Sequence, residues 1–259
     1  MIGSKKVVVV MPAYNAEATL ERTIQDIPPG AADLLILCDD CSADRTVAIA
    51  EQLGITVYRQ PHNMGYGANQ KRLYDAALST GADIIVMVHP DYQYDPRVIP
   101  FAAGFIASGI CDVVMGNRIR TRRETLAGGM PVYKYIANRF LTLVENIVLG
   151  QNLGDFHSGF RVYSRRVLET VNFHANSNDF IFDTEFLAQA VHHGFRIGDI
   201  PVPTRYFPGA SSINFRRSLQ YGLHTLWVLI QYLLQGAGIR RFAIFDPRDA
   251  IVEGGRRRD

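Results

Sequence analysis

Residues 84–88 form an unbroken run of apolar, mostly β-branched side chains that stops at a polar cluster. Such a run predicts a strand buried on both faces, as in the parallel sheet of an α/β protein. The cluster supplies candidate metal ligands at His89, Asp91, Gln93 and Asp95. Side chains at the carboxyl end of a parallel strand lie in the crevice where open α/β sheets bind ligands. A divalent cation held there can bind a diphosphate, which favours a nucleotide-dependent transferase.

Apolar and amphipathic segments alternate along the chain up to about residue 116. Strands are expected at 7–11, 34–38, 56–59, 84–88 and 112–115, and helices at 17–26, from Ser42 or Asp44 to Leu53, at 68–79 and at 97–108. Later elements are expected as helices at 131–149 and 183–193 and as strands within 155–163 and at 195–200. This rhythm predicts the α/β class, with a mostly parallel, Rossmann-like sheet covered by helices on both faces.

Residues 219–238 form the longest apolar stretch, but four polar side chains interrupt it, so it does not read as a membrane span. Its apolar residues Leu223, Leu226, Trp227 and Ile230 follow helical spacing. The favoured interpretation is a helix packed on its own domain or on a dimer partner. The alternative is an interfacial membrane helix, with Trp227 and Tyr232 at the level of the lipid headgroups.

Charge argues against a nucleic-acid partner. The chain has 27 basic and 25 acidic residues, and without its last six residues, GGRRRD, the two counts are equal at 24. A nucleic-acid groove needs a basic excess that this neutral body lacks. The three cysteines show no zinc-site spacing, and so sparse a number fits a reducing compartment.

Two further predicted strands also end in polar residues. One is followed by Pro12, Ala13, Tyr14 and Asn15, and another by residues 39–44, DDCSAD. In a parallel sheet these ends and the 89–93 cluster lie on one edge, so they can form one site. Tyr14 offers a flat face for a base, and Asp39 or Asp40 can accept hydrogen bonds from a base or a ribose. Asp91, with His89 or Gln93, can hold Mg²⁺ or Mn²⁺ against two phosphates.

Each strand end also has a simpler explanation. Residues 39–44 can be a turn and a helix cap, Asp91 a turn residue before Pro96, and Tyr14 a packing residue. Their coincidence on one edge favours the joint site. The segment 63–67, NMGYG, lacks the third glycine of a dinucleotide fingerprint, and a flexible loop entering a helix is the better interpretation.

Six short motifs occur together in a characteristic order. They are PAYNA at 12–16, DDCSADRT at 39–46, NMGYGAN at 63–69, PDYQ at 90–93, GNR at 116–118 and SGFRVYSRRVL at 158–168. Over roughly residues 6–215 the chain resembles the family-2 glycosyltransferases, most closely the branch of dolichol-phosphate mannose synthase and its bacterial polyprenyl-phosphate relatives. The resemblance implies a GT-A fold, a UDP- or GDP-sugar donor, a divalent cation (Mg²⁺ or Mn²⁺) and an inverting transfer.

By position in these motifs, the resemblance assigns the nucleoside to Pro12, Tyr14, Asp39 and Asp40. Asp91 matches the second acid of the family's Asp-x-Asp motif. Gln93 matches the glutamine that often follows the motif, so that both would bind the metal. Arg118 would contact a phosphate of donor or acceptor, and Arg205 lies in the segment from which relatives reach the diphosphate.

The acceptor side is assigned less directly. Asp183 and Glu185 occupy positions where many family members carry acids facing the acceptor. Arg161 either shapes the acceptor side or forms a salt bridge within the fold. If the acceptor is a polyprenyl phosphate, basic residues near Lys134 and Arg139 can bind its phosphate.

Two residues depart from the family pattern. His89 stands where the first acid of Asp-x-Asp is usual, and imidazole ligates Mn²⁺ better than Mg²⁺. Ala16 replaces an acid that often follows the asparagine of this motif. The metal preference and the nucleobase therefore stay open.

The expected activity is transfer of a sugar to a polyprenyl phosphate, catalysed through Asp91 and Arg118. One alternative is transfer to a sugar or lipid hydroxyl, with Asp183 as general base. Another is a non-catalytic subunit that binds a nucleotide sugar and regulates a partner. A nucleotide-cofactor oxidoreductase is less favoured, because no G-x-G-x-x-G follows the first strand.

The expected organisation is a catalytic domain over 1–215, with a nucleotide-sugar half at about 1–118 and an acceptor half at about 119–215. Residues 216–240 would form an amphipathic helix that contacts a dimer partner or a membrane surface, followed by a disordered basic tail at 241–259. Polyprenyl-phosphate relatives often carry C-terminal transmembrane helices. Without them, this chain would reach lipid through 211–238, its tail or a partner. We expect it in the cytoplasm, peripheral to the inner face of the membrane.

Overall fold

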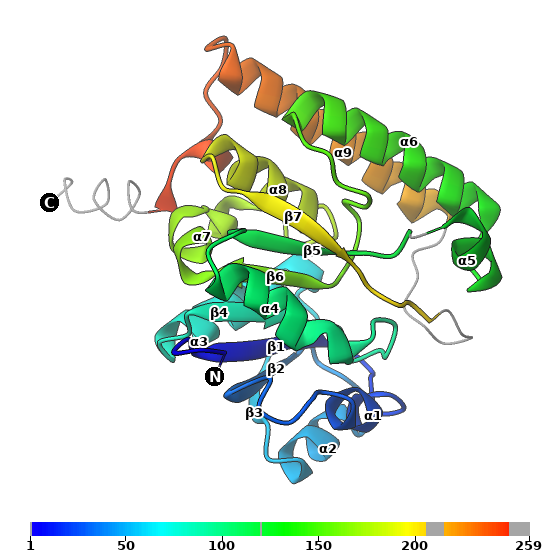
Figure 1. Ribbon diagram of the computed structural model, residues 1–259, viewed down its shortest axis with the longest axis vertical. Coiled ribbons are helices and arrows are strands. Elements are labelled where there is room, and N and C mark those ends of the chain that lie inside the picture. Colours follow the sequence, from blue (N-terminus) through cyan, green and yellow to red (C-terminus); the bar gives the residue numbers. More distant parts are fainter. Residues whose placement is uncertain (1, 120, 206–214, 249–259) are drawn as a thin grey trace, which may run out of the picture.

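In the computed structural model, which describes residues 2–119, 121–205 and 215–248, seven strands form one sheet (Figure 1). The strands are β1 (Val7–Ala13), β2 (Leu34–Asp39), β3 (Thr56–Arg59), β4 (Ile84–Met87), β5 (Val113–Asn117), β6 (Arg161–Ser164) and β7 (Ile197–Pro201). Their order is β3-β2-β1-β4-β6-β5-β7. β6 runs antiparallel to its neighbours β4 and β5, and every other neighbouring pair is parallel. The sheet is therefore mostly parallel, as predicted.

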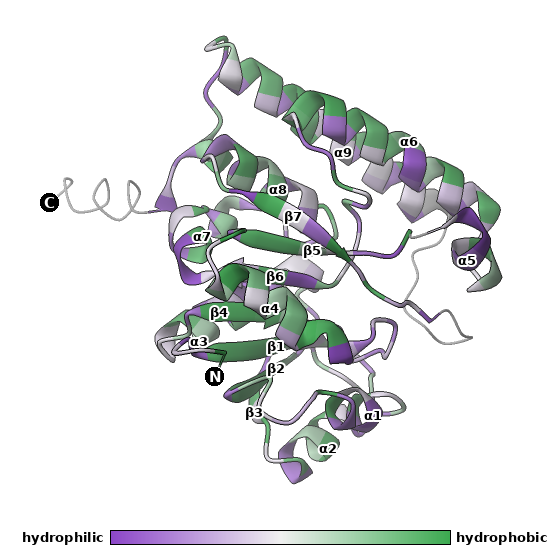
Figure 2. Ribbon diagram, viewed as in Figure 1, coloured by the Kyte–Doolittle hydropathy of each residue, from purple (hydrophilic) through white to green (hydrophobic). Residues whose placement is uncertain are grey.

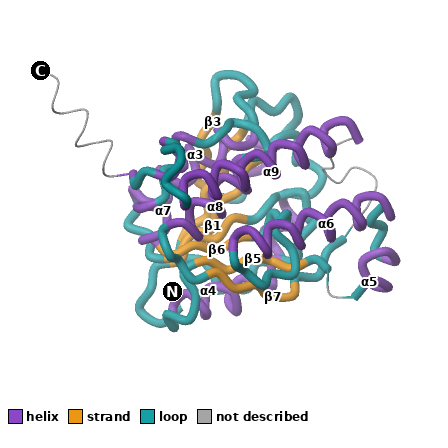
Figure 3. Tube along the Cα trace, turned by 90° about the horizontal axis from the view of Figure 1, so that it is seen from above, coloured by secondary structure: helices purple, strands orange, loops and turns teal. Residues whose placement is uncertain are grey.

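Helices cover both faces of the sheet. The α-helices are α1 (Leu20–Gln25), α2 (Thr46–Gln52), α3 (Tyr66–Ser79), α4 (Ile99–Ala107), α5 (Arg122–Ala127), α6 (Val132–Leu149), α7 (Arg165–Thr170), α8 (Phe182–His192) and α9 (Phe215–Gly236). Short 3₁₀ helices are η1 (Pro96–Val98), η2 (Phe173–Ala175) and η3 (Ala243–Phe245). Seen from above, the sheet lies between α4 and a layer that contains α3, α8 and α9 (Figure 3). Within the described ranges, no helix combines the length and the apolar character needed to cross a bilayer.

The central strands are apolar on both faces because each face has its own core. Successive side chains of a strand point to opposite faces. Val8 and Val10 of β1 pack in the cluster that includes Tyr74 of α3, whereas Val7 belongs to the cluster that includes Ile99 of α4. All five side chains are closed to solvent. The central strands accordingly appear as continuous hydrophobic segments in Figure 2.

The structure departs from the expected elements mainly after residue 119. Helices α5 and α7, of six residues each, were not predicted. Residues 241–248, expected in a disordered tail, pack on the domain instead. Phe245 is buried and Arg248 donates a hydrogen bond to Asp75 Oδ1 at 2.8 Å. The remainder of that tail, 249–259, lies outside the described residues.

Candidate active site

The sheet order brings three polar strand ends together. Strands β2, β1 and β4 are neighbours, and Ala13 at the end of β1 pairs with Asp39 at the end of β2. Tyr14, Asp39, Asp40 and the residues that follow β4 therefore share one edge of the sheet, where the sequence placed the site. Pro12 is buried within β1, while the Tyr14 side chain is 56% exposed just beyond it. Tyr14 is thus open to a stacking partner.

Asp39 and Asp40 are both buried, but they have different partners. Asp40 accepts hydrogen bonds from the backbone N–H groups of Met64 (2.7 Å) and Gly65 (3.0 Å), one on each carboxylate oxygen. Asp39 Oδ2 accepts from the N–H of Ser42 at 3.0 Å, whereas Oδ1 has no hydrogen-bond partner in the described part of the chain. A buried acceptor without a donor is costly unless a ligand supplies one. Asp39 is therefore the better candidate for contact with a nucleoside.

The glycines of the 63–67 loop serve close packing. A side chain at Gly65 would meet the backbone oxygen of Asn178 at 2.6 Å, and one at Gly67 would collide with the backbone of Ser177. The loop enters α3, as predicted, but it is held against residues 177–178 and by Asp40. This packing places the Tyr66 side chain at the edge of the site, where its hydroxyl donates to Asp183 Oδ2 at 2.9 Å.

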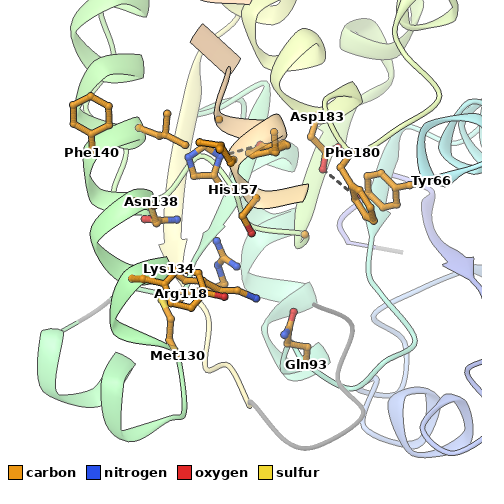
Figure 4. Close-up of a pocket in the computed structure, with 18 of the residues that line it drawn as sticks. Tyr66, Gln93, Arg118, Met130, Lys134, Asn138, Phe140, His157, Phe180 and Asp183 are labelled. Atoms are coloured by element: carbon orange, nitrogen blue, oxygen red, sulfur yellow. Dashed lines mark hydrogen bonds between the residues drawn. The ribbon is translucent and has the colours of Figure 1, made fainter. Parts of the chain in front are cut away.

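A cavity of about 510 Å³ starts at the end of β4 and runs between α6 and α9 (Figure 4). Its polar lining includes His89, Asp91, Gln93, Arg118, Lys134, Asn138, His157 and Asp183. Its apolar lining includes Met130, Tyr133, Phe140, Leu141, Leu219, Leu223 and Leu226. One end of the cavity can therefore hold charged groups, and the other can hold hydrocarbon.

His89 lies in an aromatic environment. Its ring stacks on Tyr66 with centroids 5.5 Å apart, and Nε2 lies 3.4 Å from the Tyr66 hydroxyl. A side chain on Gly159 would approach the imidazole to 2.6 Å, so the glycine makes room for the ring. Burial lowers the pKa of His89, although Asp91 and Asp183 act in the opposite direction. Burial therefore favours the neutral form of this imidazole.

The possible metal ligands at this end of the cavity suit a divalent cation that takes most of its ligands from a bound diphosphate and water. Asp91 Oδ1 accepts from the backbone N–H of Gln93 at 3.0 Å, and both residues line the cavity. Among the described residues, no group of three or more His, Cys, Asp or Glu side chains could hold a metal ion. One carboxylate, a neutral imidazole and an amide suit a cation that takes its other ligands from a diphosphate and water.

Two cations line the middle of the cavity. Arg118 binds Asp155 through Nε (2.6 Å) and Nη2 (3.1 Å), and Asp155 also accepts from Asn138 Nδ2 at 2.9 Å. Although burial alone would raise the pKa of Asp155, Arg118 holds it well below its usual range. Burial and the charge of Arg118 lower the pKa of Lys134. Lys134 and the Arg118–Asp155 pair thus give this part of the cavity a local excess of one positive charge, which is suited to an anion.

Asp183 lies in the cavity wall but is fully engaged. Its carboxylate accepts hydrogen bonds from Tyr66 and from Gln70 Nε2 at 3.0 Å, and it forms an ion pair with Arg161 Nη2 at 3.2 Å. Arg161 is 1% exposed and also donates to the backbone oxygens of Ser158 and Phe156. Of the two roles the sequence left open for Arg161, the structure supports the salt bridge within the fold.

Besides Arg161 and the four residues assigned to the nucleoside, three predicted site residues do not line the cavity. Arg139 donates to the carbonyl oxygen of Gly154, and Glu185 accepts from the N–H of Ser177 at 2.7 Å. Burial raises the pKa of Glu185. Arg205 pairs with Asp95 at 3.2 Å, and residues 206–214, which follow it, lie outside the described residues.

The cavity also contains a polar network that the sequence did not suggest. His157 Nε2 lies 3.2 Å from the buried Glu145 carboxylate of α6, and Nδ1 lies 3.0 Å from the hydroxyl of Tyr221 in α9. That hydroxyl is also 3.0 Å from Thr184 of α8. The network ties three helices together around the cavity. Its members come from distant parts of the chain, so no local pattern could have revealed them.

Comparison with known proteins agrees with this architecture. The family model described as glycosyl transferase family 2 matches residues 8–171. The low-salt glycan biosynthesis hexosyltransferase Agl6 of Haloferax volcanii is 30% identical over 89% of this chain, which spans only 55% of that protein. The dolichyl-phosphate hexose transferase of the same organism is 28% identical over 80% of this chain and 86% of its own length. Polyprenol monophosphomannose synthase of Mycolicibacterium smegmatis is 24% identical over 77% of each chain.

Solved structures show the same fold. Glucosyl-3-phosphoglycerate synthase from Mycobacterium tuberculosis, in complex with UDP, superposes with a TM-score of 0.68 at 22% identity, covering 92% of this chain and 82% of that one. The same enzyme with Mg²⁺ and UDP gives a TM-score of 0.67. The fold is thus GT-A. The match to the family model covers more than half of the sequence, and the chain belongs to glycosyltransferase family 2.

Proposed function

We propose that this chain transfers a sugar from a nucleotide-sugar donor, a UDP- or GDP-sugar, to a polyprenyl phosphate, with inversion at the anomeric carbon. The observation that carries the proposal is the order of groups along one cavity. In Figure 4, Gln93 lies toward one end and Phe140 of α6 toward the other, with Arg118 and Lys134 between them. Asp91 also lines the cavity, as do apolar residues of α6 and α9. A polyprenyl phosphate has the complementary parts, an anionic head on a long hydrocarbon. The names of two relatives, dolichyl-phosphate hexose transferase and polyprenol monophosphomannose synthase, support this acceptor class.

The proposed reaction is a single in-line displacement. A phosphate oxygen of the acceptor attacks the anomeric carbon and forms the new C–O bond. The bond from that carbon to the diphosphate oxygen breaks, and its electron pair leaves with the nucleoside diphosphate. Arg118 and Lys134 hold the acceptor phosphate and orient its oxygen, which is already an anion and needs no base.

The donor would occupy the edge formed by β1, β2 and β4. Tyr14 would stack on the base, and Asp39 Oδ1 would accept a hydrogen bond from the base or ribose. Asp91, with Gln93 and His89 beside it, would hold a Mg²⁺ or Mn²⁺ ion. When bound, such an ion neutralises charge on the diphosphate that leaves. Asp39 would thus contact the nucleoside of the donor, and Asp91 would hold the ion that binds its diphosphate.

Transfer to a hydroxyl group is the second candidate, and it needs a general base. Asp183 is the carboxylate closest to that role, since it lines the cavity. Its two oxygens already accept hydrogen bonds from Tyr66 and Gln70 and pair with Arg161. A carboxylate engaged in this way is poorly placed to take a proton, which favours the phosphate acceptor.

We further propose that the protein acts in the cytoplasm, at the inner face of the cell membrane. Sparse cysteines fit a reducing compartment, and the proposed acceptor is a membrane lipid.

The proposal can be tested in one assay. Purified protein is incubated with Mg²⁺ or Mn²⁺, a panel of nucleotide sugars and a polyprenyl phosphate. Mass spectrometry should detect a glycosyl phospholipid whose mass equals that of the acceptor plus one sugar residue. Donor binding measured by calorimetry, with no product from any acceptor, would instead favour the non-catalytic regulatory subunit. Product from a hydroxyl acceptor alone would favour the second candidate.

A further inference from the structure

Helices α6 and α9 pack side by side at the edge of the molecule (Figure 1), and each exposes a stripe of large apolar side chains. The stripe of α6 consists of Ile136, Phe140, Leu143 and Ile147, all at least 58% exposed. The stripe of α9 consists of Leu219, Leu223, Trp227, Ile230 and Leu233, all at least 46% exposed. In both stripes the residues are three or four apart, so each stripe occupies one face of its helix. Figure 2 shows hydrophobic residues recurring along both helices. We call these nine side chains the α6–α9 face.

The charge of this region suits an anionic surface. Glu145 is the only acidic residue in the sequences of α6 and α9, and it is 1% exposed. Basic residues lie in both helices, with Lys134 near the beginning of α6 and the exposed Arg217 near the beginning of α9. Such residues near an apolar face are attracted to anionic lipid headgroups.

The cavity opens on the same face. Phe140, Leu219 and Leu223 line the cavity and are also 58–60% exposed, so they form its rim. In Figure 4, Met130 and Lys134 lie on the same side of the cavity as Phe140, toward Arg118. A ligand that passes this rim leaves an apolar surface and meets the two cations. The entrance thus joins the α6–α9 face to the proposed phosphate site.

We propose that the α6–α9 face docks on a membrane surface that contains anionic lipid, with the rim of the cavity turned toward the acyl chains. Trp227 belongs to this face, whereas Tyr232, expected beside it at headgroup level, packs against Phe245 instead (6.1 Å between centroids). The docked orientation lets a lipid acceptor pass from the bilayer into the cavity without crossing water. This last step rests on the proposed function, while the docking itself does not.

Vesicle co-sedimentation tests the docking directly, using phosphatidylcholine vesicles with and without phosphatidylglycerol. The full chain should bind both, and more tightly when phosphatidylglycerol is present. The triple variant Ile136→Ser, Ile147→Ser and Leu233→Ser removes three exposed side chains that do not line the cavity. Its partition coefficient should fall about 100-fold or more, because even a partly buried aliphatic side chain contributes several-fold.

A control is available at α4. Phe101 in α4 and Ile110 just after it are 70% and 58% exposed, and α4 packs on the opposite face of the sheet. The double variant Phe101→Ser, Ile110→Ser should bind vesicles like the wild type. Equal binding by the triple variant and the wild type would overturn the proposal. A second result would also overturn it: the wild type is a dimer, and the triple variant is a monomer that still binds vesicles. The α6–α9 face would then be covered by a second copy of the chain.

The activity assay separates this inference from the proposed function. With a water-soluble, short-chain prenyl phosphate, the triple variant should be as active as the wild type. With a long-chain acceptor in vesicles, the activity of the triple variant should fall in proportion to its loss of vesicle binding. If only the wild type binds vesicles and neither protein glycosylates any prenyl phosphate, the docking surface stands and the proposed acceptor is wrong.

Discussion

Lys134 and Arg139 are the two basic residues of α6, and the structure separates their roles. They are five residues apart, so on a helix of 3.6 residues per turn they point about 140° apart. Lys134 lines the cavity beside Arg118, whereas Arg139 donates to the carbonyl oxygen of Gly154. We predict that Lys134→Met weakens the use of the acceptor phosphate and that Arg139→Met does not. Methionine keeps an unbranched side chain that suits a helix and removes the charge in both variants.

The size of the Lys134 effect follows from the contact it would make. A hydrogen bond to a charged group contributes about 1.5–3 kcal/mol. Since about 1.4 kcal/mol corresponds to a tenfold change, kcat/KM for the acceptor should fall roughly 10- to 150-fold. The ammonium group must be protonated to bind an anion, and burial and Arg118 lower its pKa. In the wild type, kcat/KM for the acceptor should therefore decline as the pH rises through this lowered pKa. The Lys134→Met profile should lack that decline.

The assay is initial-rate kinetics with the acceptor and the donor varied separately. The loss should appear in kcat/KM for the polyprenyl phosphate, while the KM for the nucleotide sugar changes little. Thermal unfolding of both variants checks that the fold is intact. If Arg139→Met loses acceptor use as strongly as Lys134→Met, or if Lys134→Met changes only the donor KM, the assignment of Lys134 is wrong.

Three further variants test the rest of the site. Asp91→Asn should abolish transfer and leave the unfolding midpoint unchanged, and substantial activity would refute the metal assignment. His89→Asp restores the usual acid and should keep or raise the rate with Mg²⁺; complete loss would mean that the imidazole has a specialised role. Asp155→Asn leaves Arg118 without its buried counter-ion, so it should cost about 3–5 kcal/mol of unfolding free energy. The pKa of Asp155 is lower in the folded than in the unfolded chain, so the stability that its charge provides is lost as the pH falls below about 3.8. The difference in unfolding free energy between wild type and Asp155→Asn should therefore narrow there, as calorimetry at several pH values can show.

The placement of the proposed donor residues on one sheet edge was predictable because its information is local. An apolar run ends and carboxylates follow, as at Asp39 and Asp91, and parallel strands bring such ends to one edge. Even here, the sequence did not distinguish Asp39 from Asp40. The distinction depends on the 63–67 loop, whose N–H groups occupy both oxygens of Asp40. That contact joins residues 24 and 25 positions apart and leaves no periodic trace.

The acceptor half was less predictable because long-range packing builds it. Asp183 meets Tyr66 across 117 positions of sequence, and His157 meets Tyr221 across 64. The reversal of β6 between β4 and β5 gives the sheet its second half, and neither strand order nor direction follows from hydrophobic periodicity. The apolar spacing of α9 was visible in the sequence. That α9 lies beside α6, with the two apolar stripes next to each other, is visible only in the structure.

The carboxylates around the site support one type of acceptor over another. Most of them are already engaged by donors of the protein itself: Asp40, Asp95, Asp155, Asp183 and Glu185. Asp39 keeps a buried oxygen without a partner, and Asp91 accepts a single backbone hydrogen bond, but both lie on the donor edge. Among the described residues that line the cavity, the cations are Lys134 and Arg118, which is paired with Asp155, and the carboxylate away from the donor edge, Asp183, is committed. An acceptor that must lose a proton would find no free carboxylate there and would depend on the imidazole of His89 or His157. A phosphate arrives as an anion and needs no base.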